Sequence, residues 1–298
     1  MSQADIRRLA GGPRVAFGRQ WYYKYSVIPE HVDEAHALAF VQSIERLVGS
    51  QCAQWNDAKT SEWCVRNYSA ARLILGSTIL ARSIEYAASH NLWMLLPHGA
   101  YYLALSALRT MIITSPRSAD ITLKSALEMS HRKTINVAVS ILRQIDSKLG
   151  IRIHTAVREL KATRELIDYR APTSGAPLND ERTMSHAEIA GIALEIAQLQ
   201  TEIRQRALEK RAIRHAPILE EHRCAAIEHV IEGIHFKDAD DAYRVDYLHR
   251  KHGFPVNLFH MISEGHVDDV MNAWGRQDGG ATNQFDPDDR IVNVFDLP

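Results

Sequence analysis

Three polar residues near the end of one predicted helix could bind an anion. Arg164 and Asp168 are four residues apart, so they face the same side of a helix and can form an ion pair. The phenol of Tyr169 can hold the helix end to the following loop. The Arg164 guanidinium is equally suited to a phosphate group. The pattern therefore leaves a ligand-binding role and a structural role open.

Fifteen histidines make a metal site the next candidate. His249 and His252 have the i, i+3 spacing that puts two ligands on one helical face, and Asp238 or Asp241 could add oxygen ligands. No zinc signature surrounds them, and histidines are commonly half-buried without a ligand role. We therefore predict no metal and no cofactor, and interpret these histidines as structural or surface residues.

Basic residues gather near the end of the longest predicted helix, at Arg204, Arg206, Lys210, Arg211 and Arg214. Such a cluster could contact phosphate or RNA. The helix dipole also favours cations at a helix C-terminus, and Glu202 and Glu209 are interleaved as ion-pair partners. We favour this second, structural interpretation.

Helical spacing of apolar residues dominates the middle of the chain. It predicts helices at about 38–48, 68–89, 97–115, 131–149, 153–169 and 186–213. The segment HGAYYLALSALRTMII is apolar on nearly all sides, which indicates a central bundle helix. Gly150 is expected to end the helix before it, and Ser185 with Glu188 to start the last helix as a capping box.

These patterns predict an all-α protein, an antiparallel up-and-down helical bundle with additional N- and C-terminal helices. We expect an irregular N-terminal arm over 1–30, the bundle over 31–214, a C-terminal helical extension over 215–274 and a flexible tail over 275–298. The extension should hold helices at about 217–233, 239–250 and 256–274. The run IVNVF at 291–295 resembles a short strand.

Composition limits the class of protein. Hydrophobic residues make up 46% and charged residues 24%, as in folded globular chains. The net charge is −1, whereas a dedicated nucleic-acid binder is strongly basic. Any contact with nucleic acid must therefore be made by a local group of basic residues. Three cysteines without CxxC spacing argue against a disulfide framework, and no run approaches the roughly 18 apolar residues of a membrane span. We expect a cytoplasmic protein that contacts no membrane.

Common catalytic motifs are missing from the sequence. It contains no Walker loop, GxGxxG, HExxH, GxSxG or EF-hand pattern. The simplest assignments to nucleotide-dependent, hydrolytic or metal-dependent enzymes are therefore excluded.

Three segments taken together resemble HEPN domains, the small helical bundles of many bacterial and archaeal toxin, defence and nucleotidyltransferase-associated proteins. The first is Ala100-Tyr101-Tyr102, which opens a buried helix that carries Arg109. The second is Ser130-His131, at the start of the following helix. The third is the run from Arg164 to Tyr169, which is similar to the Arg-x-x-x-Asp-Tyr ending of one HEPN branch. The resemblance implies an HEPN-like core at about 97–205.

The resemblance also implies a polar site where the matching helices converge, formed by Arg109, His131, Arg164, Asp168 and Tyr169. Ribonuclease members of the family use an arginine followed about one turn later by a histidine. Tyr169 stands at that position here, and a phenol with a pKa near 10 shuttles protons poorly at neutral pH compared with imidazole near 6.5.

We therefore expect a non-catalytic HEPN-like binding or regulatory protein of a bacterial nucleotide-linked or defence/toxin-type system. Its expected ligand is RNA or a nucleotide, its expected partner is a nucleotidyltransferase or another protein, and its expected assembly is a homodimer. Two alternatives stay open. One is a metal-independent ribonuclease in which Arg164 stabilises the phosphate and an unidentified histidine moves protons; the other is a structural protein that dimerises through the 186–213 helix.

Overall fold

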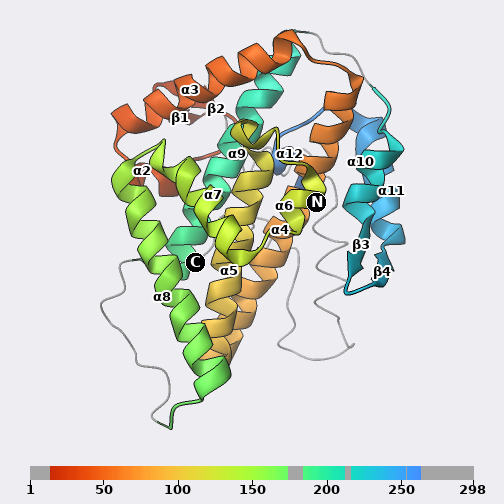
Figure 1. The fold of residues 1–298 in the computed structure, drawn as a ribbon. Helices are drawn as coiled ribbons and strands as arrows, with labels where there is room; N and C mark the ends of the chain where they lie inside the picture. Colours follow the sequence, from red (N-terminus) through yellow and green to blue (C-terminus); the bar gives the residue numbers. More distant parts are fainter. Residues whose placement is uncertain (1–13, 174–183, 212–215, 253, 263–298) are drawn as a thin grey trace, which may run out of the picture.

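The chain folds into a helical bundle (Figure 1). The computed structural model describes residues 14–173, 184–211, 216–252 and 254–262, and 75% of these residues are helical. Eleven α-helices and two small sheets make up this described part, which confirms the predicted all-α bundle with additional helices at both ends. None of the described helices combines the length and the apolar character needed to cross a bilayer.

The elements follow each other with short connections. The N-terminal part holds β1 (Arg14–Ala16), β2 (Arg19–Trp21), α2 (Val27–His31), α3 (Glu34–Ala53) and α4 (Asp57–Ser89). The middle holds α5 (Leu95–Thr114), the 3-10 turn η1 (Pro116–Ser118), α6 (Leu123–Leu127), α7 (His131–Arg143), α8 (Ser147–Arg170) and α9 (His186–Lys210). The C-terminal part holds α10 (Glu220–Ile227), β3 (Glu228–Ile231), β4 (Ile234–Lys237), α11 (Ala239–His252) and α12 (Leu258–Ile262).

Helix α5 is the centre of the bundle, as its all-round apolar sequence predicts. It packs against α4, α7, α8 and α9. Tyr101, Leu108 and Met111 on it are fully buried. Burial of a side chain of this size stabilises the fold by about 1.5–3 kcal/mol relative to leaving it exposed. Polar residues carried by α5 are therefore held on a rigid element.

Helix α9 begins at the predicted capping box. The Ser185 hydroxyl accepts a hydrogen bond from the Glu188 amide at 3.1 Å, and the Glu188 carboxylate accepts one from the Ser185 amide at 2.7 Å. The apolar seam from Ile189 to Ile203 is buried within the chain. The intramolecular bundle is thus confirmed, and the described structure leaves no apolar seam on α9 for a dimer.

Glu195 of α9 holds the start of α2. Its buried carboxylate accepts hydrogen bonds from the backbone amides of Ser26, Val27 and Ile28 at 2.7, 3.0 and 2.8 Å. These amides belong to a helix start, where no intrahelical acceptor exists. Burial raises the pKa of Glu195, although the amides that donate to it oppose that shift.

The expectation of an irregular arm over 1–30 is wrong for its described part. β1 and β2 form an antiparallel hairpin whose turn residues, Phe17 and Gly18, have φ values of 52° and 67°. Glu202 of α9 accepts hydrogen bonds from the Tyr22 amide at 2.6 Å and from the Tyr25 hydroxyl at 3.2 Å. Glu202 lies far along the chain from Tyr22 and Tyr25, so no local sequence pattern could predict that this segment has a defined structure.

The helix predicted over 131–149 is two helices. α7 ends at Arg143, and Asp146 takes extended backbone angles and accepts a hydrogen bond from the Lys148 amide at 2.7 Å, which starts α8. Gly150 lies inside α8 rather than at a helix end. The apolar spacing runs across the break because residues on both sides pack into one core, so periodicity alone could not locate it.

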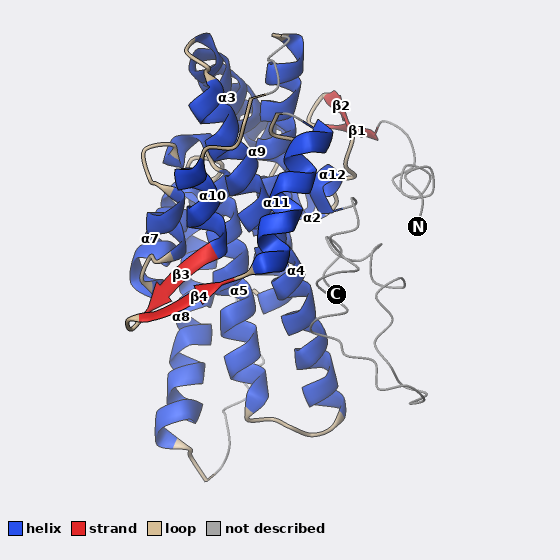
Figure 2. Cartoon of the chain, turned by 90° about the vertical axis from the view of Figure 1, so that its right-hand side faces the viewer, coloured by secondary structure: helices blue, strands red, loops and turns tan. Residues whose placement is uncertain are grey.

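The C-terminal elements cover α4. α10, α11 and α12 pack against that helix. The helix predicted over 217–233 ends at Ile227 and gives way to the hairpin β3–β4, visible in Figure 2. Its turn residues Glu232 and Gly233 have φ values of 52° and 80°, as a two-residue hairpin turn requires. Predictions for 263–298, including the tail and the strand at 291–295, lie outside the described residues.

Candidate functional site

Side chains of α5, α7 and α8 meet in one group, here called the α5–α7–α8 cluster. It contains His98, Tyr101, Tyr102, Arg109, His131, Arg164, Asp168 and Tyr169. All five residues predicted for a polar site belong to it. They meet because α8 follows α7 after a short connection and packs against it, which brings the start of α7 near Lys161 and Arg164 of α8.

Arg164 contacts most members of the cluster. Its Cζ atom lies 5.4, 6.0 and 5.6 Å from the ring centroids of Tyr101, Tyr102 and Tyr169, and its Nη1 lies 3.3 Å from Oδ2 of Asp168. The side chain is only 10% exposed, and its Nε has no hydrogen-bond partner among the described residues. Burial lowers the pKa of Arg164, but Tyr102, Tyr169 and Asp168 more than offset this and raise it. The guanidinium is a permanently charged donor.

His131 begins α7 beside Tyr101. Its Nδ1 lies 3.1 Å from the Tyr101 hydroxyl. Burial lowers the pKa of His131, and the positive charges of Arg109 and Arg164 lower it further. At neutral pH the imidazole is therefore uncharged and able to accept a proton or a hydrogen bond.

Arg109 binds the backbone of the segment that leads into α7. Its Nη2 donates to the Met129 carbonyl at 2.9 Å, two residues before α7 begins. Burial lowers the pKa of Arg109. The structure thus places Arg109 as a positioning residue, because it ties the segment that carries His131 to α5.

His98 is a member that the sequence reasoning missed. Its Nδ1 lies 3.6 Å from Oδ2 of Asp168, and its side chain is 53% exposed. The ring of Tyr102 lies 4.7 Å from the ring of His98 and 5.7 Å from that of His131, centroid to centroid. A signal existed, since His98, Tyr102 and Arg109 have i, i+4, i+11 spacing and so share one face of α5.

The tyrosines differ in burial. Tyr101 is fully buried, whereas Tyr102 is half-buried. Tyr169 is 71% exposed, and its ring lies against Arg164. Most of the loop that its hydroxyl was expected to hold, from residue 174 on, lies outside the described residues.

The cluster can bind an anion and exchange a proton. It combines a nearly buried cation, a neutral imidazole and a second imidazole beside a carboxylate. Exposed Tyr169 and half-exposed His98 form its open side. Arginine donors at low exposure interact strongly with phosphate because water competes less there.

The other sequence candidates do not form a comparable site. Arg204 is fully buried, lies 3.2 Å from the centroid of the Trp63 ring, and donates to the Thr114 carbonyl at 3.2 Å. Arg206 pairs with Glu202 at 2.6 Å. These contacts support the structural interpretation for Arg204 and Arg206, whereas Arg214 lies outside the described residues.

Histidine clustering gives no metal centre in the part of the chain that the structure describes. No group of three or more His, Cys, Asp and Glu side chains there is placed to hold an ion. His249 and His252 instead line a small apolar cavity next to Tyr68 and Leu248. Asp241 is bound by Tyr68 and Arg72, so its carboxylate is already in use.

Comparisons with known proteins found no matching family model, no matching curated protein and no matching solved structure. The resemblance to HEPN domains therefore stays a prediction.

Proposed function

We propose that the α5–α7–α8 cluster binds a phosphate group of RNA or of a nucleotide, and that the protein is a non-catalytic binding or regulatory component of a bacterial nucleotide-linked or defence system. The observation that carries the proposal is Arg164. Its guanidinium is nearly buried against three tyrosine rings, and its buried Nε donor has no partner among the described residues.

The surroundings of Arg164 favour an anion over a cation. Lys161 and Arg109 add positive charge near His131. The two nearest carboxylates are already paired, Asp168 with Arg164 and His98, and Glu165 with Arg164 and Lys161. A phosphate arriving on the open side could replace part of the Asp168 contact and gain donors from Arg164 and His98. Tyr169 is 71% exposed, so the ring face that Arg164 does not cover is available for a base to stack on.

The system and the partner rest on the HEPN resemblance. We propose on the same ground that the partner is a nucleotidyltransferase or another protein and that the protein is a homodimer. Light scattering tests the assembly, since a monomeric mass would contradict the dimer.

Binding of a labelled single-stranded RNA in EDTA, followed by fluorescence anisotropy, tests the proposal. Arg164→Ala should weaken binding by about tenfold or more, because a charge-assisted contact is lost. Arg170→Ala is the matched control, since Arg170 is an exposed arginine on the same helix. Equal affinity of wild type and Arg164→Ala would contradict the proposal.

A metal-independent ribonuclease is the second candidate, favoured by the two histidines beside Tyr102. A ribose 2′-hydroxyl would attack the adjacent phosphorus while His131 takes its proton. The P–O5′ bond would break as a proton passes from His98, which lies beside Asp168, to the leaving oxygen, which yields a 2′,3′-cyclic phosphate and a free 5′-hydroxyl. Arg164 would stabilise the charge on the phosphorane oxygens.

Cleavage assays separate the two candidates. RNA incubated with the protein in EDTA should stay intact if the role is binding alone. Cleavage that disappears in His131→Ala and His98→Ala, and not in the exposed-histidine control His90→Ala, would favour the ribonuclease. Cleavage unchanged in all three variants would point to a contaminating nuclease.

A further inference from the structure

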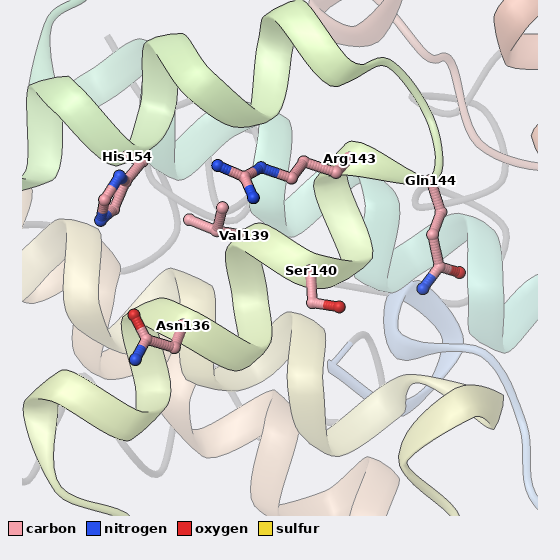
Figure 3. A pocket seen from close by; sticks show the side chains of 6 residues that line it. All are labelled: Asn136, Val139, Ser140, Arg143, Gln144 and His154. Carbon is pink, nitrogen blue, oxygen red and sulfur yellow. The ribbon is translucent and has the colours of Figure 1, made fainter.

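A polar pocket opens between α7 and α8, apart from the α5–α7–α8 cluster. It has a volume of about 460 Å³ and is lined by Asn136, Val139, Ser140, Arg143, Gln144 and His154. This volume lies in the range of small-molecule sites, roughly 300–1,000 Å³. Figure 3 shows the Arg143 side chain extending over Val139 toward the His154 ring, with Asn136 below both.

Among the residues that the structure describes, the five polar side chains of this pocket have no protein partner; His154 is half-buried and the other four are exposed. Within the described chain, neither a hydrogen bond nor an ion pair involves the side chains of Asn136, Ser140, Arg143, Gln144 or His154. Other serines on helices, such as Ser77 and Ser83, use their hydroxyls on the carbonyl four residues earlier. Ser140 leaves its hydroxyl available. The pocket therefore offers one cation, one imidazole, two amides and one hydroxyl to a ligand.

Close packing of the two helices shapes the pocket. At Gly150 of α8, an added Cβ would come within 2.5 Å of the Arg143 Cγ and 3.1 Å of its backbone nitrogen. The glycine lets the end of α7 lie directly against the start of α8. His154, one turn further along α8, is thereby brought opposite the α7 residues that line the pocket.

The charge around the pocket is positive. Residues 131–170 contain nine Lys and Arg against four Asp and Glu, a net +5 in a chain whose net charge is −1. Lys133 lies on the same face of α7 as Asn136 and Ser140, and Arg158 lies one turn after His154 on α8; both are exposed. This field attracts an anion and repels a metal ion.

We propose that the α7–α8 pocket is a separate binding site for the phosphate group of a nucleotide. Arg143 and His154 contact the phosphate. The single amide of Asn136, on the His154 side of the pocket in Figure 3, carries the donor and the acceptor that recognise the edge of a base such as adenine. The phosphate can belong to a free mononucleotide or to a nucleotide within an oligonucleotide.

Calorimetric titration of the full chain with adenosine monophosphate, and separately with an oligoadenylate of about eight nucleotides, tests this site. Arg143→Gln and His154→Ala should each weaken binding about tenfold or more, since each removes a direct phosphate contact. Arg152→Gln is the charge-matched control: Arg152 is exposed on α8, but two residues turn a helix by about 200°, so it faces away from His154. The affinity of Arg152→Gln for each probe should stay within about twofold of that of wild type.

The outcomes separate this site from the α5–α7–α8 cluster. Binding that is lost in Arg143→Gln and kept in Arg164→Ala supports the pocket. If only the oligonucleotide binds, and its binding is lost in Arg143→Gln and kept in Arg164→Ala, the pocket is also supported. The source of the phosphate is then a polynucleotide. The proposal is overturned if wild type binds neither probe, if Arg152→Gln loses as much affinity as Arg143→Gln, or if only Arg164→Ala abolishes binding. Thermal unfolding of each variant verifies that it is folded.

Discussion

Replacement of Arg164 by alanine separates a binding role from a structural one. The ion pair with Asp168 joins residues four apart on one helix and is worth roughly 0.3–0.5 kcal/mol. Contacts of the guanidinium with the rings of Tyr101 and Tyr169 add about 0.5–1 kcal/mol each. Arg164→Ala should therefore lower the free energy of unfolding by about 2 kcal/mol.

The measurement is urea denaturation of Arg164→Ala, Arg170→Ala and wild type, each with and without RNA. Arg170→Ala should change the free energy of unfolding by less than about 0.5 kcal/mol, since Arg170 is exposed. RNA should stabilise wild type and Arg170→Ala but not Arg164→Ala, because a ligand that binds only the folded state adds a stability of RT ln(1 + [L]/Kd), which falls as Kd rises.

The reasoning is refuted if Arg164→Ala costs more than about 4 kcal/mol while RNA stabilises the variant as much as it does wild type. The cluster would then be a structural connection between α5 and α8. A double-mutant cycle with Asp168→Ala would apportion the loss, and a coupling energy near 0.5 kcal/mol is expected.

Three further predictions concern stability. Glu195→Ala should cost roughly 3–5 kcal/mol in urea denaturation, because three amides at the start of α2, one buried and two partly buried, lose their acceptor. Glu195→Gln retains one acceptor oxygen and should cost less; equal losses would contradict this account. Because the pKa of His131 is lowered in the folded state, the unfolded chain binds more protons just below about pH 6.5, so stability should fall as pH drops through that range. His131→Gln should flatten this part of the stability–pH profile, and an unchanged profile would count against the lowered pKa. Ser185→Ala should lower the free energy of unfolding by about 1 kcal/mol in urea denaturation, because the capping box of α9 is lost. Ser147→Ala is the control and should leave the free energy of unfolding unchanged, because Asp146, not Ser147, caps α8.

Sequence alone determined the features that arise from local patterns. The all-round apolar segment identified α5 as the central helix, and the Ser185 capping box with its apolar seam located α9. The spacing of Arg164 and Asp168 indicated their ion pair. Each of these signals is contained within a few helical turns, where i, i+3 and i, i+4 neighbours are fixed by helix geometry.

Tertiary structure decided which of these elements became neighbours. The contact of His98 with Asp168 joins α5 to α8, and the hydrogen bonds of Glu195 join α9 to α2. The burial of Arg204 against Trp63, rather than its exposure to a phosphate, depends on the packing of α9 beside α4. A sequence pattern gives the face on which a polar side chain lies but not the helix that it meets, because that choice is made by the packing of the whole apolar core.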